Sequence, residues 1–415
     1  MSSISESGGD GDATPNSLDT KRSTTVYRTL LPKAHSTHQA FILRPVPFTE
    51  PQVEQVPIPS LLPGSVILRI LATPLHPYSK QVFGFYNPNG SPHEKPCIPG
   101  SSAIARVSQV GDDAISLKVG QLVFFDPVMK GRDSPETVRF PNPVHHGFDV
   151  QSTRMIASSG FADGSYAELM RAPLENCYPL DEAKLMGDPM NWGFAYTPEQ
   201  LCAIATFLRP FGGLANIDVK PGEAILISPA TSPKGVAACM VALAMGARVV
   251  ACCHNEAKLL HLNQTLARTR NGSDERISTV TWTGDCTKDV LNIQTFGAMD
   301  AFLDISPPGA RGSSHLESGI LSLRPGGRVG LMGAYKRIEI PHQFVMRCNI
   351  TLKGNWMYER KDALALIKMV ERGNLRLKEE DGCYVVGQFR LYQWKEAMVA
   401  ASQLNGIGES VVFSF

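Results

Sequence analysis

Residues 198–344 alternate between short apolar runs and longer helix-like segments, and this alternation constrains the fold more than any other feature of the chain. The apolar runs have the length and β-branched content of buried strands. The expected strands are 223–228, 248–253, 277–282, 300–305 and 327–333, and the expected helices between them are 235–247, 256–269 and 312–323. Strands that alternate with helices form right-handed β-α-β units. The pattern therefore predicts an α/β fold with a doubly wound parallel sheet.

The rest of the chain has a different pattern of apolar residues. Between 38 and 197, short apolar runs are separated by Pro and Gly, which predicts a small, mostly β domain. Residues 345–415 mix strands with helices, and we expect them to return to that domain. Residues 1–37 are rich in Ser, Gly and Asp, which predicts a disordered tail. With 415 residues the chain is long enough for two domains, the second being the parallel-sheet domain at 198–344.

Composition excludes several kinds of partner. The 40 Lys and Arg nearly balance the 39 Asp and Glu, so the charge pattern of a nucleic-acid or acidic-membrane binder is absent. No apolar run reaches the length of about 18 residues that crosses a bilayer. Nine Cys without a C-x-x-C pair indicate a reducing compartment rather than a disulfide framework, so we expect a cytoplasmic protein. A small-molecule substrate is the expected partner.

The turn SPATSPKGVA at 228–237 joins the first expected strand to the first expected helix. In a dinucleotide-binding fold this turn holds the diphosphate, with glycines at three positions. Here Ala230 and Ser232 take two of those positions, and only Gly235 is glycine. The expected cofactor-binding residues of the turn are Thr231, Ser232, Lys234, Gly235 and Val236. The alternative is a plain strand-to-helix connector.

The end of the next strand bears on cofactor choice. An acid at this point would bind the ribose diol of NAD, but the position falls on Cys253. His254, Asn255 and Lys258 are donors for a 2′-phosphate, so the sequence favours NADP(H). Glu256 keeps NAD(H) open.

Several segments together resemble the medium-chain dehydrogenase/reductase superfamily. The segment PGSSAIARVSQVGDDAISLKVGQLVF at 99–124 is similar to its GroES-like catalytic domain, as is DGSYAELMRAPLENCYPL at 163–180. The segments at 217–251 and 323–333 are similar to the opening and the last strand of its Rossmann domain. Three further stretches, FLRPFGGLANIDVKPGE, ITLKGNWMYER and GRDSPETVRF, resemble the zinc-independent, fungal alcohol-dehydrogenase-like branch, which includes enoyl and quinone reductases.

The resemblance also implies where a catalytic zinc would be held. Zinc members use a Cys after the second barrel strand, where this chain has His76, and a Gly-His-Glu segment, which here reads Gly100-Ser101-Ser102. Two serines do not replace a His ligand and its acidic partner. The adjacent His145 and His146 lack a third ligand nearby in the sequence. We therefore expect no metal.

Without a metal, hydride transfer needs an electron-poor acceptor and a proton source. The resemblance places Tyr86 opposite the nicotinamide as the catalytic proton donor, with Tyr78 as an alternative. It also places main chain of Gly333 and Ala334 against the carboxamide. Asp304 ends an expected strand, so it either faces the cofactor or caps a helix.

These expectations define the function to be tested. The chain is expected to be a zinc-independent, NADP(H)-dependent oxidoreductase that reduces a conjugated carbonyl, enoyl or quinone-like molecule. The fungal branch adds secondary metabolism and a possible homodimer to these expectations. The alternatives are an alcohol/ketone dehydrogenase and a catalytically silent nucleotide-binding scaffold.

Overall fold

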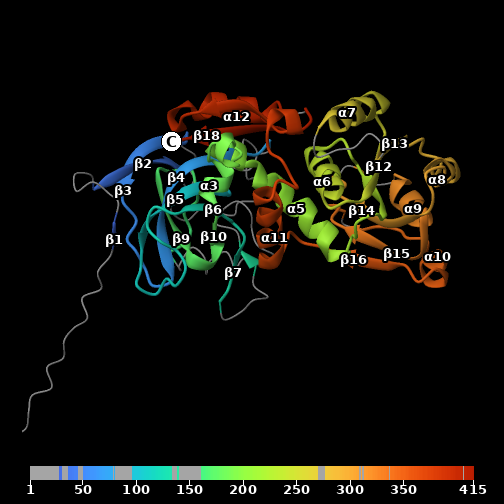
Figure 1. Cartoon of the computed structure of the whole chain (residues 1–415), viewed down its shortest axis with the longest axis horizontal. Coiled ribbons are helices and arrows are strands. Elements are labelled where there is room, and N and C mark those ends of the chain that lie inside the picture. The colour runs from blue at the N-terminus through green and yellow to red at the C-terminus, as the bar shows by residue number, and fades with distance from the viewer. Residues whose placement is uncertain are drawn as a thin grey trace, which may run out of the picture.

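The computed structural model contains two large sheets, each with its own helices, lying side by side (Figure 1). The structure describes residues 28–29, 36–44, 50–77, 79, 96–132, 138–139, 160–269, 276–307, 310, 313–335, 337–404 and 406–415. Within these ranges, no helix has both the length and the apolar character needed to span a bilayer.

The first sheet has eight strands, with the order β10-β6-β5-β4-β18-β17 and with β1 and β9 pairing onto β5 and β4. Its strands are β1 (Arg28–Thr29), β4 (Ser65–Leu75), β5 (Ala103–Val110), β6 (Leu122–Phe125), β9 (Leu169–Pro173), β10 (Cys177–Pro179), β17 (Tyr384–Phe389) and β18 (Glu409–Ser414). Two small sheets accompany it, β2 (Thr37–Ile42) with β3 (Gln52–Pro57) and β7 (Met129–Lys130) with β8 (Val138–Arg139). Most pairings are antiparallel, whereas β17 and β18 run parallel.

The structure corrects the expected N-terminal tail at its end. Residues 28–29 form β1, which pairs with β5 through Arg28 opposite Val110. Residue 37 begins β2. The prediction that the whole of 1–37 is disordered is therefore wrong for these residues, because the backbone groups of β5 supply pairing partners that composition does not reveal.

The second sheet is parallel and has six strands in the order β13-β12-β11-β14-β15-β16. The strands are β11 (Ala224–Ser228), β12 (Arg248–Cys253), β13 (Ile277–Thr281), β14 (Met299–Asp304), β15 (Leu323–Leu331) and β16 (Thr351–Gly354). The helices that follow them are α6 (Pro233–Ala244), α7 (Glu256–Arg268), α8 (Cys286–Gln294), α9 (His315–Leu321) and α10 (His342–Arg347). Ile225 and Ile227 face the cluster that contains α6 and α7, while Ala224 and Leu226 face α8 and α9. Helices thus cover both faces, and the expected doubly wound sheet is confirmed.

Two features of this sheet were not expected. The boundary at 344/345 is wrong by one strand, because β16 pairs in parallel with β15, placing Thr351 opposite Arg328. Helix α8, which begins after the cap Asp285, is also absent from the predicted elements. Its Leu291 is 60% exposed, so the helix lacks the clear apolar stripe on which a prediction depends.

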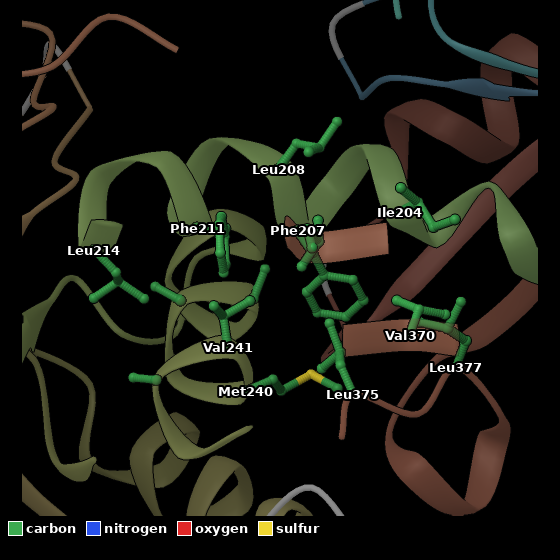
Figure 2. Packing of buried hydrophobic residues seen from close by; sticks show 14 of the residues in the cluster. Ile204, Phe207, Leu208, Phe211, Leu214, Met240, Val241, Val370, Leu375 and Leu377 are labelled. Atoms are coloured by element: carbon green, nitrogen blue, oxygen red, sulfur yellow. The ribbon is translucent and has the colours of Figure 1, made fainter. Parts of the chain in front are cut away.

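A shared apolar cluster joins the two halves of the molecule. It is centred on α5 (Ala203–Asn216), whose Phe207 and Phe211 pack toward Met240 and Val241 of α6 (Figure 2). Among the described residues, the remaining helices are α3 (Glu182–Leu185), α4 (Pro198–Leu201), α11 (Arg360–Glu371) and α12 (Trp394–Ser402), with 3-10 turns at Leu174–Asn176, Pro189–Asn191, Glu379–Asp381 and Leu391–Gln393. Since α11 and strands of the first sheet contribute to the same cluster, the two halves share one hydrophobic core.

Candidate functional site

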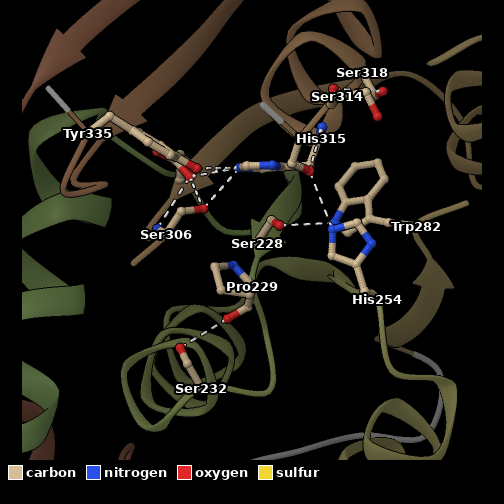
Figure 3. Close-up of polar contacts among 12 residues, drawn as sticks. Ser228, Pro229, Ser232, His254, Trp282, Ser306, Ser314, His315, Ser318 and Tyr335 are labelled. Carbon is tan, nitrogen blue, oxygen red and sulfur yellow. Dashed lines mark hydrogen bonds and ion pairs between the residues drawn. The ribbon is translucent and has the colours of Figure 1, made fainter. Parts of the chain in front are cut away.

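The carboxyl ends of the parallel strands bring the predicted cofactor residues to one edge of the sheet. Ser228, at the end of β11, lies opposite Asp304, which in turn lies opposite Leu331 at the end of β15. In open parallel sheets, ligands bind outside the carboxyl ends of the strands. The polar side chains at this edge come from strand ends, from the loops after them and from α9 (Figure 3).

The glycine-poor turn folds as a capped helix start. The Ser228–Pro229 peptide bond is cis, and Ser232 is the N-cap of α6. A Cβ on Gly235 would lie 2.0 Å from the carbonyl oxygen of Pro229. Only glycine therefore fits where α6 packs against the turn. This close packing is what the third glycine of a dinucleotide turn provides.

The Ser232 hydroxyl makes its hydrogen bonds within the turn. Its Oγ accepts a hydrogen bond from the Gly235 N–H at 3.0 Å and donates one to the Pro229 carbonyl at 3.1 Å. The hydroxyl thus stabilises the start of α6. Thr231 lies beside it, with Oγ1 2.9 Å from Sγ of Cys253, and so links the turn to the end of β12.

The residues after β12 are exposed, as groups that bind the 2′-phosphate of NADP(H) must be. His254, Asn255 and Lys258 all lie on the surface. Asn255 is the N-cap of α7, because its side chain accepts from the Lys258 N–H at 2.9 Å. His254 Nε2 lies 3.3 Å from Ser313 Oγ. Of the three, the Lys258 ammonium makes no hydrogen bond or ion pair with any residue that the structure describes.

A buried polar network at the ends of β14 and β15 was not predicted. Ser306 Oγ donates to Asp304 Oδ1 at 2.6 Å and lies 2.9 Å from His315 Nε2, which is also 2.9 Å from the Tyr335 hydroxyl. Asp304 is 1% exposed and His315 is 4% exposed. Asp304 is therefore buried beneath its hydrogen-bond partners. Its carboxylate holds Ser306 in place and does not face a ligand.

The outer member of this network is Tyr335, which is partly exposed. Desolvation and the nearby charge of Asp304 raise the pKa of Tyr335 to about 12, against the effect of the Ser306 hydrogen bond. It stays protonated at neutral pH and is held against His315. Gly333 precedes it, and a Cβ there would lie 2.3 Å from Asp304 Oδ2. Ala334 is held through its N–H, which donates to the Ser306 carbonyl at 2.9 Å.

The loop where zinc dehydrogenases hold their metal is filled by hydroxyl hydrogen bonds. Ser101 Oγ donates to the Pro74 carbonyl at 3.0 Å, and the Ser101 N–H donates to Ser165 Oγ at 3.0 Å. Thr73 Oγ1 donates to the Ser102 carbonyl at 2.9 Å and lies 2.7 Å from Ser165 Oγ. These groups are buried and satisfied by one another. Hydroxyls are not among the Cys, His and carboxylate ligands that zinc prefers, so this donor set does not fit a catalytic zinc.

Other predicted chemistry falls on parts of the chain that the structure leaves out. Tyr86, Tyr78 and the pair His145-His146 all lie outside the described residues. His76 is described and exposed at the end of β4. The described residues contain no group of three or more His, Cys, Asp or Glu that could hold a metal ion.

A second polar set lies between the two halves. Tyr358, after β16, donates to Asp126 Oδ1 at 2.7 Å, and the Val128 N–H donates to the same oxygen at 2.9 Å. Asp126 follows β6 of the first sheet and is 3% exposed. Desolvation raises the pKa of Asp126 to about 6, despite these hydrogen bonds and the charges of Arg360 and Lys130. Perturbed acids at domain junctions are common at functional sites.

Family models match both halves of the chain. Residues 62–182 match the alcohol dehydrogenase GroES-like domain, and residues 233–372 match the model described as zinc-binding dehydrogenase. The chain is a medium-chain dehydrogenase/reductase. It is therefore an oxidoreductase that exchanges hydride with a nicotinamide dinucleotide, and the expected pairing of a GroES-like domain with a Rossmann sheet is confirmed.

Individual relatives agree with this assignment. The probable D-xylulose reductase A of Aspergillus clavatus is 25% identical over 291 residues, which is 68% of this chain and 72% of the relative. Two solved structures have the same fold. The alcohol dehydrogenase of E. coli CFT073, complexed with NADH, gives a TM-score of 0.68 at 15% identity, covering 92% of this chain and 100% of that one. A crotonyl-CoA carboxylase/reductase gives 0.65 at 16% identity, covering 91% and 88%.

The residues at the strand ends fit a nicotinamide dinucleotide. The first turn of α6 presents the positive end of a helix dipole, and Lys234 adds a cation there. The same edge of the sheet is polar at His254 and Tyr335 and has a small side chain at Ala334.

Proposed function

We propose that this medium-chain dehydrogenase/reductase is a zinc-independent, NADP(H)-dependent reductase of a conjugated carbonyl, enoyl or quinone-like small molecule. The hydroxyl network around Ser101 carries the proposal, because it puts Ser hydroxyls, already bonded to main chain and to each other, where zinc members have metal ligands. A chain without that Lewis acid needs an acceptor whose conjugation spreads the charge left by hydride addition. We also propose a role in fungal secondary metabolism.

The residues of the chain divide the work as follows. The first turn of α6 and Lys234 would hold the diphosphate, and Gly333 and Ala334 would present main chain to the carboxamide. The dinucleotide, when bound, supplies the hydride. Tyr86 remains the predicted proton donor, since a phenol can donate to an oxygen on which negative charge develops.

The proposed preference for NADP(H) rests on the end of β12. Cys253 occupies the position of a ribose-binding acid, and Lys258 has an exposed ammonium with no counter-ion among the described residues. Glu256 is the first residue of α7. Its carboxylate would favour NAD(H) if it bound the ribose diol. Affinity for the two cofactors therefore depends on whether Lys258 or Glu256 faces the ribose.

NADPH is expected to bind at least about tenfold more tightly than NADH, since one hydrogen bond to a charged group contributes about 1.5–3 kcal/mol. Lys258→Met should remove this difference and leave NADH affinity unchanged. Lys288→Met is the matched control, since Lys288 is an exposed lysine in the first turn of α8. Fluorescence titration with each cofactor measures both affinities. Tighter binding of NADH by the wild type would overturn the NADP(H) assignment.

Removal of metal should leave the enzyme intact. Protein purified without chelator is expected to contain well below one zinc per chain by elemental analysis. Dialysis against a chelator should change neither the melting temperature nor the affinity for NADPH. Near-stoichiometric zinc, or loss of NADPH turnover after chelation that added zinc restores, would contradict the zinc-independent proposal.

An alcohol/ketone dehydrogenase is the second candidate, favoured by the D-xylulose reductase relatives. The two candidates separate in one assay. NADPH oxidation with activated alkenes or quinones, and not with xylulose, supports the first; the reverse supports the second. A silent scaffold is not favoured by the family assignment.

We also propose a homodimer, formed through β16 at the edge of the parallel sheet.

A further inference from the structure

A cavity of about 430 Å³ lies beside the first sheet, where two strands share one edge of β4. Strand β9 pairs with residues 65–69 of β4, and β18 pairs with residues 72–75 on the same edge. Ile70 and Leu71 lie between these two pairings and line the cavity. Strand β2 closes another side through Gln39. The cavity therefore results from the way in which β2, β9 and β18 meet along β4.

This cavity is separate from the edge where the dinucleotide is expected. Its described lining comes from β2, β3, β4, the start of β9 and Phe415, and includes no residue of the parallel sheet. In Figure 1, β2, β3 and β4 lie at the end of the molecule away from β12 and β13. A molecule bound in the cavity would thus leave the cofactor residues free.

His38 supplies a buried polar atom to the cavity. This residue of β2 is 4% exposed. Its Nδ1 lies 3.2 Å from the Gln39 carbonyl oxygen and 3.4 Å from the Leu169 nitrogen. Nε2 makes no hydrogen bond with a residue that the structure describes, yet protein atoms do not seal it off, so it opens into the cavity. Since buried polar groups are rarely left unpaired, Nε2 is expected to meet a molecule there.

The other polar groups of the lining carry charges of both signs. Arg69 has only hydrogen-bond donors, whereas Glu168 has only acceptors, one of which takes the main-chain N–H of Gln39 at 2.7 Å. Within the described ranges, neither Arg69 nor Glu168 forms an ion pair. The amide of Gln55 and the hydroxyl of Thr37 add further donors and acceptors. The lining therefore suits a molecule that has no net charge and both donates and accepts hydrogen bonds.

Hydroxyl groups meet this requirement, because each donates one hydrogen bond and accepts others. Burial lowers the pKa of His38, which keeps its ring neutral, and a hydroxyl suits Nε2 whichever ring nitrogen carries the proton. Leu71, Leu169 and Phe415 give the lining an apolar part, against which the C–H face of a ring can pack. The volume also lies within the range of about 300–1,000 Å³ that is usual for small-molecule sites.

We propose that this cavity is a second binding site, which takes a neutral polyhydroxylated ring compound of the size of a monosaccharide. Arg69 and Gln55 donate to its hydroxyl oxygens, Glu168 accepts from its hydroxyl groups, and His38 Nε2 holds the most deeply placed hydroxyl. The bound ring connects β2, β4 and β9, and so stabilises the folded first domain by mass action. The site does not depend on which compound the enzyme reduces.

Glucose is the probe, and tetrahydropyran is the matched compound that has the ring without the hydroxyls. Saturation-transfer NMR titrations of the full chain should show binding of glucose and not of tetrahydropyran. Arg69→Met and His38→Phe should each weaken glucose binding about tenfold, through the loss of one hydrogen bond to a charged or buried group. Arg248→Met, at an exposed position of β12, should keep the wild-type affinity. Melting temperatures show which variants are folded, and the exposed Arg69 provides the test if His38→Phe is unstable.

Three results would overturn the proposal. If folded wild-type protein does not bind glucose, the cavity holds only solvent. If Arg69→Met binds glucose as tightly as the wild type, the sugar binds elsewhere, such as at the site of hydride transfer. If the zwitterion leucine binds in place of glucose and Arg69→Met weakens it, the two charges of the cavity hold an amino acid. All these variants should keep the wild-type affinity for NADP⁺, so a protein that binds glucose but no dinucleotide fails the proposed function alone.

Discussion

Gly235→Val is expected to abolish dinucleotide binding and to lower the free energy of unfolding by about 3 kcal/mol or more, the upper end of overpacking effects. The added Cβ would lie 2.0 Å from the Pro229 carbonyl oxygen, and the atoms of Ala230 lie 2.8 Å from it. These are main-chain atoms, so the turn must move away from α6. That movement displaces the N–H groups which a diphosphate would meet. Urea unfolding and NADPH titration measure the two effects.

Gly354→Ala is the matched control, because a Cβ at Gly354 has no other atom within 4 Å. Gly354 belongs to the same sheet, at the end of β16. It should change stability by less than about 1 kcal/mol, consistent with an open position. If Gly235→Val binds NADPH with wild-type affinity, then this turn is not the cofactor turn, and the connector alternative gains support.

The free energy of unfolding of Asp126→Asn, relative to that of the wild type, is expected to be higher at neutral pH than at acid pH. Burial raises the pKa of Asp126 from the ordinary value of 3.8 to about 6. Between these values the folded state holds the proton more tightly than the unfolded chain does, so ionisation opposes folding as the pH rises. The shift corresponds to a penalty of about 3 kcal/mol, fully present above pH 6 and absent below pH 4. Asparagine carries no such penalty.

Unfolding free energies at pH 4 and pH 7 test this sign. The difference between Asp126→Asn and wild type should move in favour of the variant by roughly 3 kcal/mol from pH 4 to pH 7. Asp112→Asn, at an exposed position, should show no such movement. Tyr358→Phe removes a donor to the carboxylate and should enlarge the penalty at pH 7. A pH-independent difference for Asp126→Asn would mean that Asp126 is not desolvated in solution.

The fold was largely predictable because it depends on local pattern. The expected strands at 223–228 and 248–253 correspond to β11 and β12, since buried parallel strands are continuous apolar runs. The boundary after 344 was wrong because β16 is short and mostly exposed, so its apolar content does not mark it as a sheet strand.

The site was predictable only where one turn contains it. The packing requirement for glycine at Gly235 could be predicted because this residue has a fixed place in the turn after a strand. Gly212 and Tyr358 come from separate elements and meet only when α5 packs against the segment after β16. No periodicity in the sequence relates such positions.

The place of β18 in the first sheet has a consequence for synthesis. This strand lies between β4 and β17, yet in the chain it follows every strand of the parallel sheet. As the polypeptide leaves the ribosome, the parallel sheet is complete while one edge of β4 still exposes its backbone groups. Such an open edge is a template for pairing with other chains. The nascent protein is therefore most vulnerable to misassembly in its first domain, during the interval before residues 409–414 emerge.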